Sequence, residues 1–540
     1  MVKKILVPTR PLKERRLKRL LGRGYFPTEL PPTFTTEDFA NSTTKLRSAW
    51  DVEKILAFRT KPEHYSIPRY GHARRSLSIV NPVNQFAVAK IIADNWPDIE
   101  KRLKRSSTSE FKPAILLSGP GRSVTGVDFD AVARRRSKIL GLYGRYVKTD
   151  VTRFFPSIYT HSIAWSLVGK EFAKKNYNKP AFKGHFGNQL DRAIGAGQEG
   201  QTVGIPIGPD TSRIVSELIA AEIEQIAKQT IPDLNDRSVR YVDDFIIGLR
   251  EDETESAVLV GIANALYEYE LELSAEKTDT HGMGCKHAPE WVSFIRNFEP
   301  SPGTRQRDDL DSFFEHALYL ADENSKEHVL LFAAKRAVSF SVQTTNTAHL
   351  FRWLLYCARR SPSCLRFVAE HLAAIRADKV TDKGEIADFI LQQVPVKAEA
   401  AHTDEVAWLL FWAREIGLKL DAGLFDRVRP LRSSAVGLLT LDLNDRGLIS
   451  GKLKVPEWKA FATQDGLKSE MWLLAYEATL KGWWPGSVKS SFVSGHPYFG
   501  TLWSEKVEFY DPKKTSKAAT TPSRMVFRAS PSSDYGDEYI

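Results

Sequence analysis

Two adjacent aspartates, Asp243 and Asp244, interrupt the apolar run RYVDDFIIG at residues 240–248. The β-branched and aromatic residues on either side predict two strands joined by a tight turn. Neighbouring carboxylates repel each other and lose solvation when buried, so placing them together costs free energy. A bound metal ion would offset that cost, and exposure of the turn to solvent would reduce it. The pair by itself leaves both explanations open.

A third acidic residue stands at the end of another predicted strand. Asp150 closes the run RYVKTDV (residues 145–151), and two phenylalanines, a proline and a helical pattern follow it. If the two strands are neighbours in a sheet, their carboxylates form a site for a hard divalent cation such as Mg²⁺. Two such ions can activate an attacking hydroxyl and stabilise a departing pyrophosphate. The sequence therefore predicts a two-metal site and does not distinguish Mg²⁺ from Mn²⁺.

A segment rich in glycine and proline lies between these acids. In GQTVGIPIGPDTSRIVSELIA (residues 200–220), Gly204 and Gly208 flank Pro206, and a helix is expected from about Thr211. A loop of this kind ahead of a helix allows the backbone to approach a nucleotide or a template closely.

The elements that must position these residues follow from hydrophobic periodicity. Residues 60–300 mix short β-branched runs with helical patterns, which indicates an α+β region. Strands are expected at residues 76–80 and 145–151, long helices at residues 160–175 and 211–229, and a short basic helix at residues 12–21.

Beyond about residue 305, long amphipathic helices replace the strand patterns. The segments at residues 352–360, 407–415 and 471–479 each contain Trp-Leu-Leu, with irregular spacing. This weak internal repeat predicts stacked helix pairs of a degenerate solenoid, with three unrelated buried helices as the alternative. The Ser-, Thr- and Lys-rich end of the chain, from about Asp511, is predicted to be flexible.

Composition sets the broad class. The chain has 540 residues, of which 42% are hydrophobic and 26% charged, and a formal net charge of +10. These values are typical of a soluble protein of two or three domains, and the positive charge suits a polyanionic partner. There is no apolar run of the length that a membrane span needs. Three scattered cysteines without a CxxC pair argue against a disulfide scaffold or a structural zinc site and favour a reducing cytosol.

Taken together, the ordered motifs resemble the palm and fingers of reverse transcriptases over about residues 60–300. FFPSIY after Asp150 is similar to their first catalytic motif, GIPIGP to the second and YVDD to the third. Lys277 matches the fourth motif, and Arg75, beside Arg74, matches the basic residue of the fingers.

The resemblance implies a role for each matching residue. Asp150 and Asp243 would hold two metal ions, with Asp244 assisting and Val151 beside them. Phe155 would screen the 2′-hydroxyl and favour deoxynucleotides, Arg75 with Arg74 would bind the triphosphate, and Lys277 would protonate the departing pyrophosphate. The residues expected near the template or the incoming base are Gln198, Gly204, Pro206 and Gly208.

Within this class, the chain most resembles bacterial abortive-infection and unknown-group reverse transcriptases, which are phage-defence enzymes. Val242 stands where viral RNA polymerases usually have glycine, and GYFPTELPPTF (residues 24–34) is similar to the group's N-terminal signature. The resemblance implies an α+β reverse-transcriptase fingers-palm followed by an all-α, HEAT-like C-terminal domain. The expected boundaries are a basic arm at 1–40, fingers and palm at 41–300, helical repeats at 301–510 and a flexible tail at 511–540.

The same resemblance implies an anti-phage RNA-directed DNA polymerase-like enzyme of the bacterial cytoplasm that polymerises dNTPs. Members of the group can be primed by a protein hydroxyl and can work without a copied template, leaving single-stranded DNA attached to the protein. Ile207, where many reverse transcriptases carry glutamine, fits relaxed templating. Candidate priming residues are Tyr535, Tyr539 and Tyr25. The basic stretches at residues 101–105 and 133–136 would line the nucleic-acid path, and the helical region would support a homo-oligomer.

Two alternatives remain open at this point. One is a templated reverse transcriptase that copies a specific non-coding RNA. The other is an inactive palm that serves as a nucleic-acid-binding scaffold.

Overall fold

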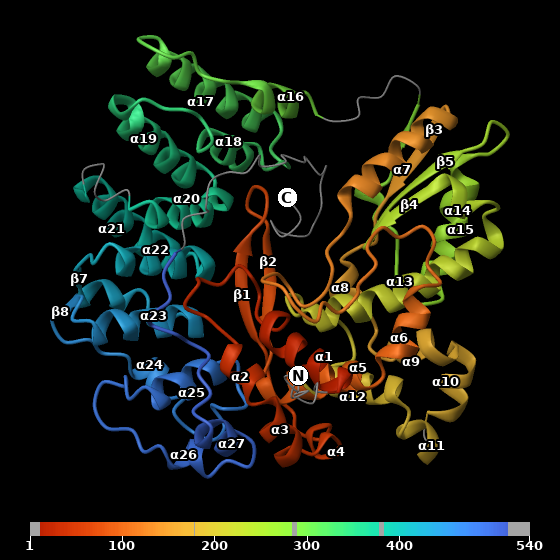
Figure 1. The fold of residues 1–540 in the computed structure, drawn as a ribbon, viewed down its shortest axis with the longest axis horizontal. Coiled ribbons are helices and arrows are strands. Elements are labelled where there is room, and N and C mark those ends of the chain that lie inside the picture. Colours follow the sequence, from red (N-terminus) through yellow and green to blue (C-terminus); the bar gives the residue numbers. More distant parts are fainter. Residues whose placement is uncertain (1–10, 178, 283–288, 377–382, 517–540) are drawn as a thin grey trace, which may run out of the picture.

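A four-stranded antiparallel sheet forms the centre of one lobe of the molecule. The computed structural model describes residues 11–177, 179–282, 289–376 and 383–516. The sheet has the strand order β4-β5-β3-β6 (Figure 1). Its strands are β3 (Arg145–Thr149), β4 (Ser238–Tyr241), β5 (Asp244–Leu249) and β6 (Asp279–His281). The strands expected at residues 145–151 and around the two aspartates are therefore confirmed.

Helices cover both faces of this sheet. On one face, Val147, Phe245 and Ile247 belong to the main core, together with the helices α13 (Asp210–Thr230) and α15 (Glu255–Tyr267). On the other face, Tyr146 and Ile246 pack with α7 (Phe129–Leu142) in a separate small cluster. Because both faces are covered, β5 is buried at every position, which explains its nearly continuous apolar sequence.

The N-terminal region packs into the body of the protein. Its elements are α1 (Leu12–Arg23), α2 (Glu37–Asn41), α3 (Thr43–Ala49), α4 (Val52–Ile55), the hairpin β1 (Glu63–Pro68) and β2 (Arg74–Ile79), α5 (Pro82–Asp94) and α6 (Trp96–Leu103). The basic helix and the strand after residue 74 are as expected. However, α1 is not part of a separate arm, because Leu17, Leu20 and Leu21 form one fully buried stripe against α5 and α2.

Short helices connect the first strand of the sheet to α13. They are α8 (Phe154–Ser157), α9 (Ser162–Val168), α10 (Lys170–Asn176), α11 (Pro180–Lys183) and α12 (Phe186–Ala196). The single helix expected at residues 160–175 is divided between α9 and α10. Gly169, with a φ of 87°, ends the first of them, because that left-handed conformation cannot continue a right-handed helix. The helix expected at residues 211–229 is confirmed as α13.

The C-terminal half is a column of helices that runs along the other lobe (Figure 1). Its larger helices are α16 (Glu290–Asn297), α17 (Gln306–Glu323), α18 (Val329–Ala337), α19 (Thr344–Arg360), α20 (Pro362–Ala374), α21 (Lys383–Glu399), α22 (Thr403–Glu415), α23 (Ser434–Asp445) and α25 (Trp472–Leu480). Its shorter elements are α24 (Pro456–Lys459), α26 (Ser491–Ser494), α27 (Phe499–Ser504), a 3₁₀ turn at Ala422–Asp426, and the two-residue strands β7 (Leu420–Asp421) and β8 (Ile449–Ser450). The short helix α14 (Leu234–Arg237) and the 3₁₀ turn at Ala275–Lys277 belong to the lobe with the four-stranded sheet.

Successive helices of this column pack as pairs, α17 with α18, α19 with α20 and α21 with α22. The three Trp-Leu-Leu segments do not mark equivalent positions in these pairs. They lie in α19, which is the first helix of its pair, in α22, which is the second, and around α25. A HEAT-like relationship therefore stays a prediction that the internal repeat does not support.

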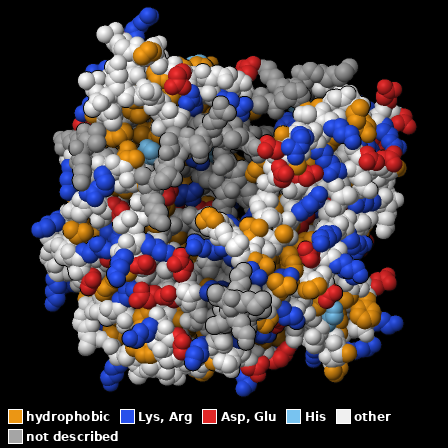
Figure 2. Space-filling view, in the orientation of Figure 1, with side chains coloured by type: hydrophobic (Ala, Val, Ile, Leu, Met, Phe, Trp, Pro, Cys, Tyr) orange, Lys and Arg blue, Asp and Glu red, His pale blue; other side chains and the backbone are white. Residues whose placement is uncertain are grey.

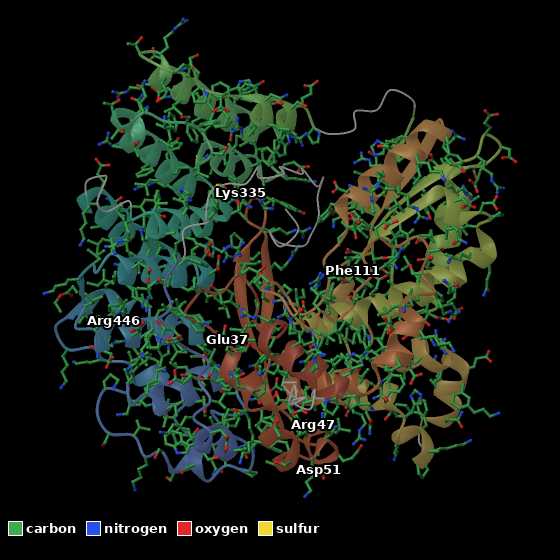
Figure 3. All side chains as sticks on the ribbon, viewed as in Figure 1. Glu37, Arg47, Asp51, Phe111, Lys335 and Arg446 are labelled. Atoms are coloured by element: carbon green, nitrogen blue, oxygen red, sulfur yellow. The ribbon has the colours of Figure 1, made fainter. Side chains whose placement is uncertain are left out.

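The end of the described chain packs against its beginning. The backbone N–H of Thr35 donates to the Phe509 carbonyl at 3.0 Å, and that of Asp511 donates to the Thr33 carbonyl at 2.7 Å. Arg446, labelled in Figure 3, donates to Asp442 at 2.7 Å and also binds the Pro512 carbonyl. Residues 511–516 thus belong to the packed body, beyond the boundary expected at residue 511.

In the described parts of the chain, no helix is both long and apolar enough to cross a membrane. Cys357 and Cys364 are buried free thiols, and Cys285 lies outside the described residues.

Candidate active site

The two aspartates that interrupt the apolar run lie at a tight hairpin turn between β4 and β5. Val242 and Asp243 form the turn, because Tyr241 pairs with Asp244 in the ladder. Val242 has a φ of 56°, a conformation that costs a β-branched residue about 1–3 kcal/mol. Asp243 and Asp244 are only 5% and 3% exposed, so the turn is not a solvated one.

Asp150 lies beside this turn. It follows β3 directly, and the pairing of Thr149 with Phe245 brings it level with the first residues of β5. Asp150 is 2% exposed, and its carboxylate pairs with the Lys277 ammonium through one oxygen. The other oxygen, Oδ1, is buried without a hydrogen-bond partner. A bare carboxylate oxygen in the interior is costly, which indicates that a cation or a proton belongs there.

The electrostatics of the turn agree with this reading. Burial, followed by the charges of Asp150 and Asp244, raises the pKa of Asp243 well above its ordinary value. Burial and Asp150 also raise the pKa of Asp244 to about 7, although Lys148 and a hydrogen bond with Tyr241 oppose the shift. The three carboxylates therefore hold more negative charge than their surroundings compensate.

The residues present partly fit a divalent cation. Asp150 is close enough to Asp243 for its charge to raise the pKa of Asp243. Carboxylate oxygens are the ligands that Mg²⁺ prefers, and water and substrate phosphates complete its coordination shell. Among the residues the structure describes, no group of three or more His, Cys, Asp or Glu side chains is arranged so that it could hold a metal ion by itself. The geometry thus offers an incomplete site, with Lys277 occupying one oxygen of Asp150.

A buried arginine stabilises the turn through a hydrogen bond and ion pairs. Arg240 is fully buried, and its Nη1 donates to the Val242 carbonyl at 2.8 Å. The same guanidinium binds both oxygens of Glu217 on α13, at 2.9 and 2.6 Å, and lies 3.7 Å from Glu224. Burial would raise the pKa of Glu224, but the charge of Arg240 and several hydrogen bonds hold it at about 2.

The sequence analysis did not predict this role of Arg240. The available signal was an arginine inside a strand whose other residues are nearly all apolar, since a buried charge must be paired. Its partners on α13 could not be identified from spacing alone.

The glycine-proline loop packs against the segment that follows Asp150. The backbone N–H of Ile205 donates to the Phe155 carbonyl at 3.0 Å, and that of Gly204 donates to the Ile158 carbonyl at 2.8 Å. The side chain of Gln198 donates to the Gly204 carbonyl at 3.0 Å. The predicted nucleotide-contacting residues of these two segments are therefore brought together.

Two glycines are needed for this arrangement. Gly204 and Gly208 have φ values of 87° and 126°, and a Cβ on Gly208 would lie 2.9 Å from Cγ of Pro27. Pro206 between them is buried. The ring of Phe155 is buried as well, at 5% exposure.

The two arginines of the hairpin have different surroundings. Arg74 forms a bidentate pair with Glu405 of α22, at 2.5 and 2.7 Å, and also binds Ser66. Arg74 thus joins the hairpin to the C-terminal helices, and its predicted contact with the nucleotide stays a prediction. Arg75, the next residue along β2, projects from the opposite face and is partly exposed.

The candidate priming tyrosines are not gathered at the site. Tyr25 is 1% exposed, and its hydroxyl donates to the Val80 carbonyl, so it is engaged in the core. Tyr535 and Tyr539 lie outside the described residues. Val151 forms an isolated bridge with Leu273, which positions the segment that carries Lys277.

Of the two basic stretches singled out in the sequence, the first covers the end of α6 and the turn after it, and the second lies on α7. Arg105 pairs with Glu222 of α13 at 2.8 Å, and Arg135 donates to the Ser107 carbonyl at 2.6 Å. Part of this positive charge therefore ties helices to the body of the protein.

Comparisons with known proteins add little to this geometry. The chain matches no protein-family model and no curated protein. Among solved structures it aligns with apo telomerase from Candida tropicalis, at 11% identity and a TM-score of 0.30, over 74% of this chain and 73% of that one. It also aligns with telomerase from Candida albicans in complex with a TWJ fragment of telomeric RNA, at 12% identity and a TM-score of 0.26, over 74% and 67% of the two chains. Likeness at this level carries no argument, so the assignment below rests on the residues.

Proposed function

We propose that the chain is a reverse-transcriptase-like nucleotidyltransferase that polymerises dNTPs. The observation that carries the proposal is the meeting of Asp150 with the buried Asp243–Asp244 turn, where one carboxylate oxygen has no partner. Acids at a strand end and at a hairpin turn of one sheet suit a polymerase palm, because both must bind the metal ions that contact the reacting phosphate.

Each residue then has a definite task. Asp150 and Asp243 would hold two Mg²⁺ ions, with Asp244 and Val151 adjoining. Bound there, the ions would supply activation of the attacking hydroxyl and charge neutralisation at the phosphates. Lys277, which pairs with Asp150, releases that carboxylate and donates a proton to the departing pyrophosphate. The backbone of Phe155 and the loop that contains Gly204 form the wall beside the incoming nucleotide.

The test uses purified full-length chain with Mg²⁺ and each labelled dNTP, without added template or primer. We expect incorporation by the wild-type chain and none by Asp243→Asn. Asp252→Asn, at an exposed position in the loop after β5, is the matched control and is expected to retain activity. Equal incorporation by wild type and Asp243→Asn, or none by wild type under any template condition, would overturn the proposal.

We further propose protein-primed synthesis without a copied template, in a defence role and in a homo-oligomer. This finer proposal rests on the sequence resemblance alone. Product that stays with the chain through denaturation supports protein priming, and product sequence that matches no co-purified RNA supports template independence. Product that copies a co-purified RNA would instead favour the templated alternative, with a specific non-coding RNA as partner.

The priming tyrosine can be sought by truncation. Because residues 511–516 are packed against Arg414 and Arg446, the chain should be cut after Ser516 so that the body is left intact. Loss of covalent product would implicate a hydroxyl of residues 517–540, with Tyr535 and Tyr539 as the candidates to replace by phenylalanine next. Unchanged labelling would exclude both tyrosines.

The scaffold alternative receives less support from the site. An inactive palm gains nothing from three buried carboxylates, of which Asp243 and Asp244 have pKa values raised by burial and by the charge of Asp150. Replacing them with apolar residues would remove that cost.

A further inference from the structure

An aromatic cluster lies next to the candidate active site and has no role in the proposed nucleotidyl transfer. The rings of Tyr159 and Tyr177 flank His161, with centroids 4.7 and 5.0 Å from the imidazole. Tyr177 is 41% exposed, and Val203 beside Tyr159 is 61% exposed. Apolar side chains gathered at a surface in this way are costly unless they serve as a binding face.

The cluster is held in place by a buried carboxylate. His161 Nδ1 lies 2.5 Å from Asp191, which is 3% exposed. Burial and then Asp191 raise the pKa values of both Tyr159 and Tyr177, so the two hydroxyls lie near the same carboxylate. The three rings therefore form a fixed platform rather than a set of independent side chains.

The platform is joined to the nucleotide wall by backbone hydrogen bonds. Tyr159 bridges Val203, and the N–H of Thr160 donates to the Thr202 carbonyl at 2.8 Å. The same loop continues to Ile205, which binds the Phe155 carbonyl. Tyr159 is four residues beyond Phe155, so the platform begins within about 13 Å of the wall even if the chain is fully extended.

Positive charge surrounds the platform. Lys174 and Lys175 on α10, Lys183 on α11 and Lys179 just before α11 are exposed. Lys170 and Lys174 lie over the Trp165 ring, with Nζ 4.9 and 5.2 Å from its centroid. Among the acids of this region, Asp191 is paired with His161, Glu268 and Glu270 are paired with Lys170, and Glu171 on α10 is exposed. Figure 2 shows hydrophobic and basic side chains mixed over this corner of the molecule, at the lower right where α10 and α11 lie in Figure 1.

We propose that this surface, made of Tyr159, His161, Tyr177 and the lysines of α10 and α11, binds single-stranded nucleic acid as it passes the active site. Exposed rings stack on successive bases without regard to sequence, and lysines track the phosphates, which is the pattern of proteins that bind single strands. The inference deepens the proposed function, since it names the strand that the same site would extend or copy.

The test measures binding of a fluorescein-labelled oligo-dT to the full chain by anisotropy, without dNTPs. Stacking contributes about 1–3 kcal/mol per base, so Tyr177→Ala should weaken binding by about fivefold or more. Tyr177→Phe keeps the ring and should bind like wild type. Tyr319→Ala, at a 60% exposed position on α17, is the remote control and should also leave binding unchanged.

The lysines make a separate prediction about salt. Each lysine that contacts a phosphate adds about 0.7 to the slope of log K against log salt for a single strand. Replacing Lys174 and Lys175 with glutamine should therefore lower the slope by up to about 1.4. Photocrosslinking with bromodeoxyuridine should label peptides that contain Tyr159 or Tyr177.

Unchanged binding by Tyr177→Ala, an unchanged salt slope, crosslinks confined to other surfaces, or no binding by the folded wild-type chain would each overturn the inference. The proposed function fails separately. If the chain binds oligo-dT through Tyr177 but incorporates no dNTP, this inference holds and the proposed function is wrong. If the chain incorporates dNTPs and Tyr177→Ala binds oligo-dT like wild type, the proposed function holds and this inference is wrong.

Discussion

Arg240 is not a predicted metal ligand, but its removal should destabilise the turn that carries Asp243 and Asp244. It is fully buried between the Val242 carbonyl and two buried carboxylates, Glu217 and Glu224. Removing one partner of a buried ion pair costs about 3–5 kcal/mol, because the remaining charge is left in the interior. Since domains are stable by only about 5–15 kcal/mol, Arg240→Met should lose a large share of the total.

The pH dependence gives this prediction a sign. In the wild type, the pKa of Glu224 is lowered to about 2, so its contribution is present above the unfolded value near 4.5 and is lost as pH falls toward 2. Without Arg240, Glu224 keeps its ion pair with Lys228 at 2.7 Å. Glu217, whose pKa burial already raises, loses the guanidinium that lowers it, so its pKa should rise further above the unfolded value. The variant should therefore lose stability as pH rises above about 4.5, which is the opposite slope.

The assay is urea unfolding, followed by tryptophan fluorescence, from pH 4.5 to pH 8. Arg250→Met removes a partly exposed arginine that pairs with Asp233 in the same lobe, and should cost less than about 1 kcal/mol. Adding Glu217→Gln and Glu224→Gln to Arg240→Met should recover part of the loss. A loss below 1 kcal/mol for Arg240→Met, or a loss that does not change between pH 5 and pH 8, would refute the reasoning.

Three further predictions concern the walls of the site. Phe155→Val should lower the preference for dNTPs over rNTPs by about tenfold or more, measured as the ratio of kcat/KM values. An unchanged ratio would mean that the Phe155 ring does not contact the sugar of the incoming nucleotide. Glu405→Gln leaves Arg74 without its charged partner and should cost about 3 kcal/mol in urea unfolding, whereas a neutral effect would mean that the pair does not hold the hairpin. Gly208→Ala should cost about 1–3 kcal/mol because of its φ of 126° and the close approach of Pro27, and wild-type stability would contradict the strain.

Local patterns were sufficient for the elements that carry the site. Alternation and β-branching located β3 and β5, and the 3.6-residue period located α13 within one residue at each end. The break at Gly169 was missed because glycine inside a helical pattern is often tolerated, and its left-handed φ depends on the neighbouring chain. The packing of α1 was missed because a basic composition hides the buried leucine stripe.

By itself, the sequence determined the chemistry that is available. It places Asp150 at a strand end, Asp243 and Asp244 at a hairpin turn and glycines where the loop needs positive φ, since these features depend on neighbouring residues. Only the tertiary structure decided the pairings. Arg74 meets Glu405 and Arg240 meets Glu217 because burial leaves a charge no other stable partner, and which partner lies within reach depends on how distant segments pack.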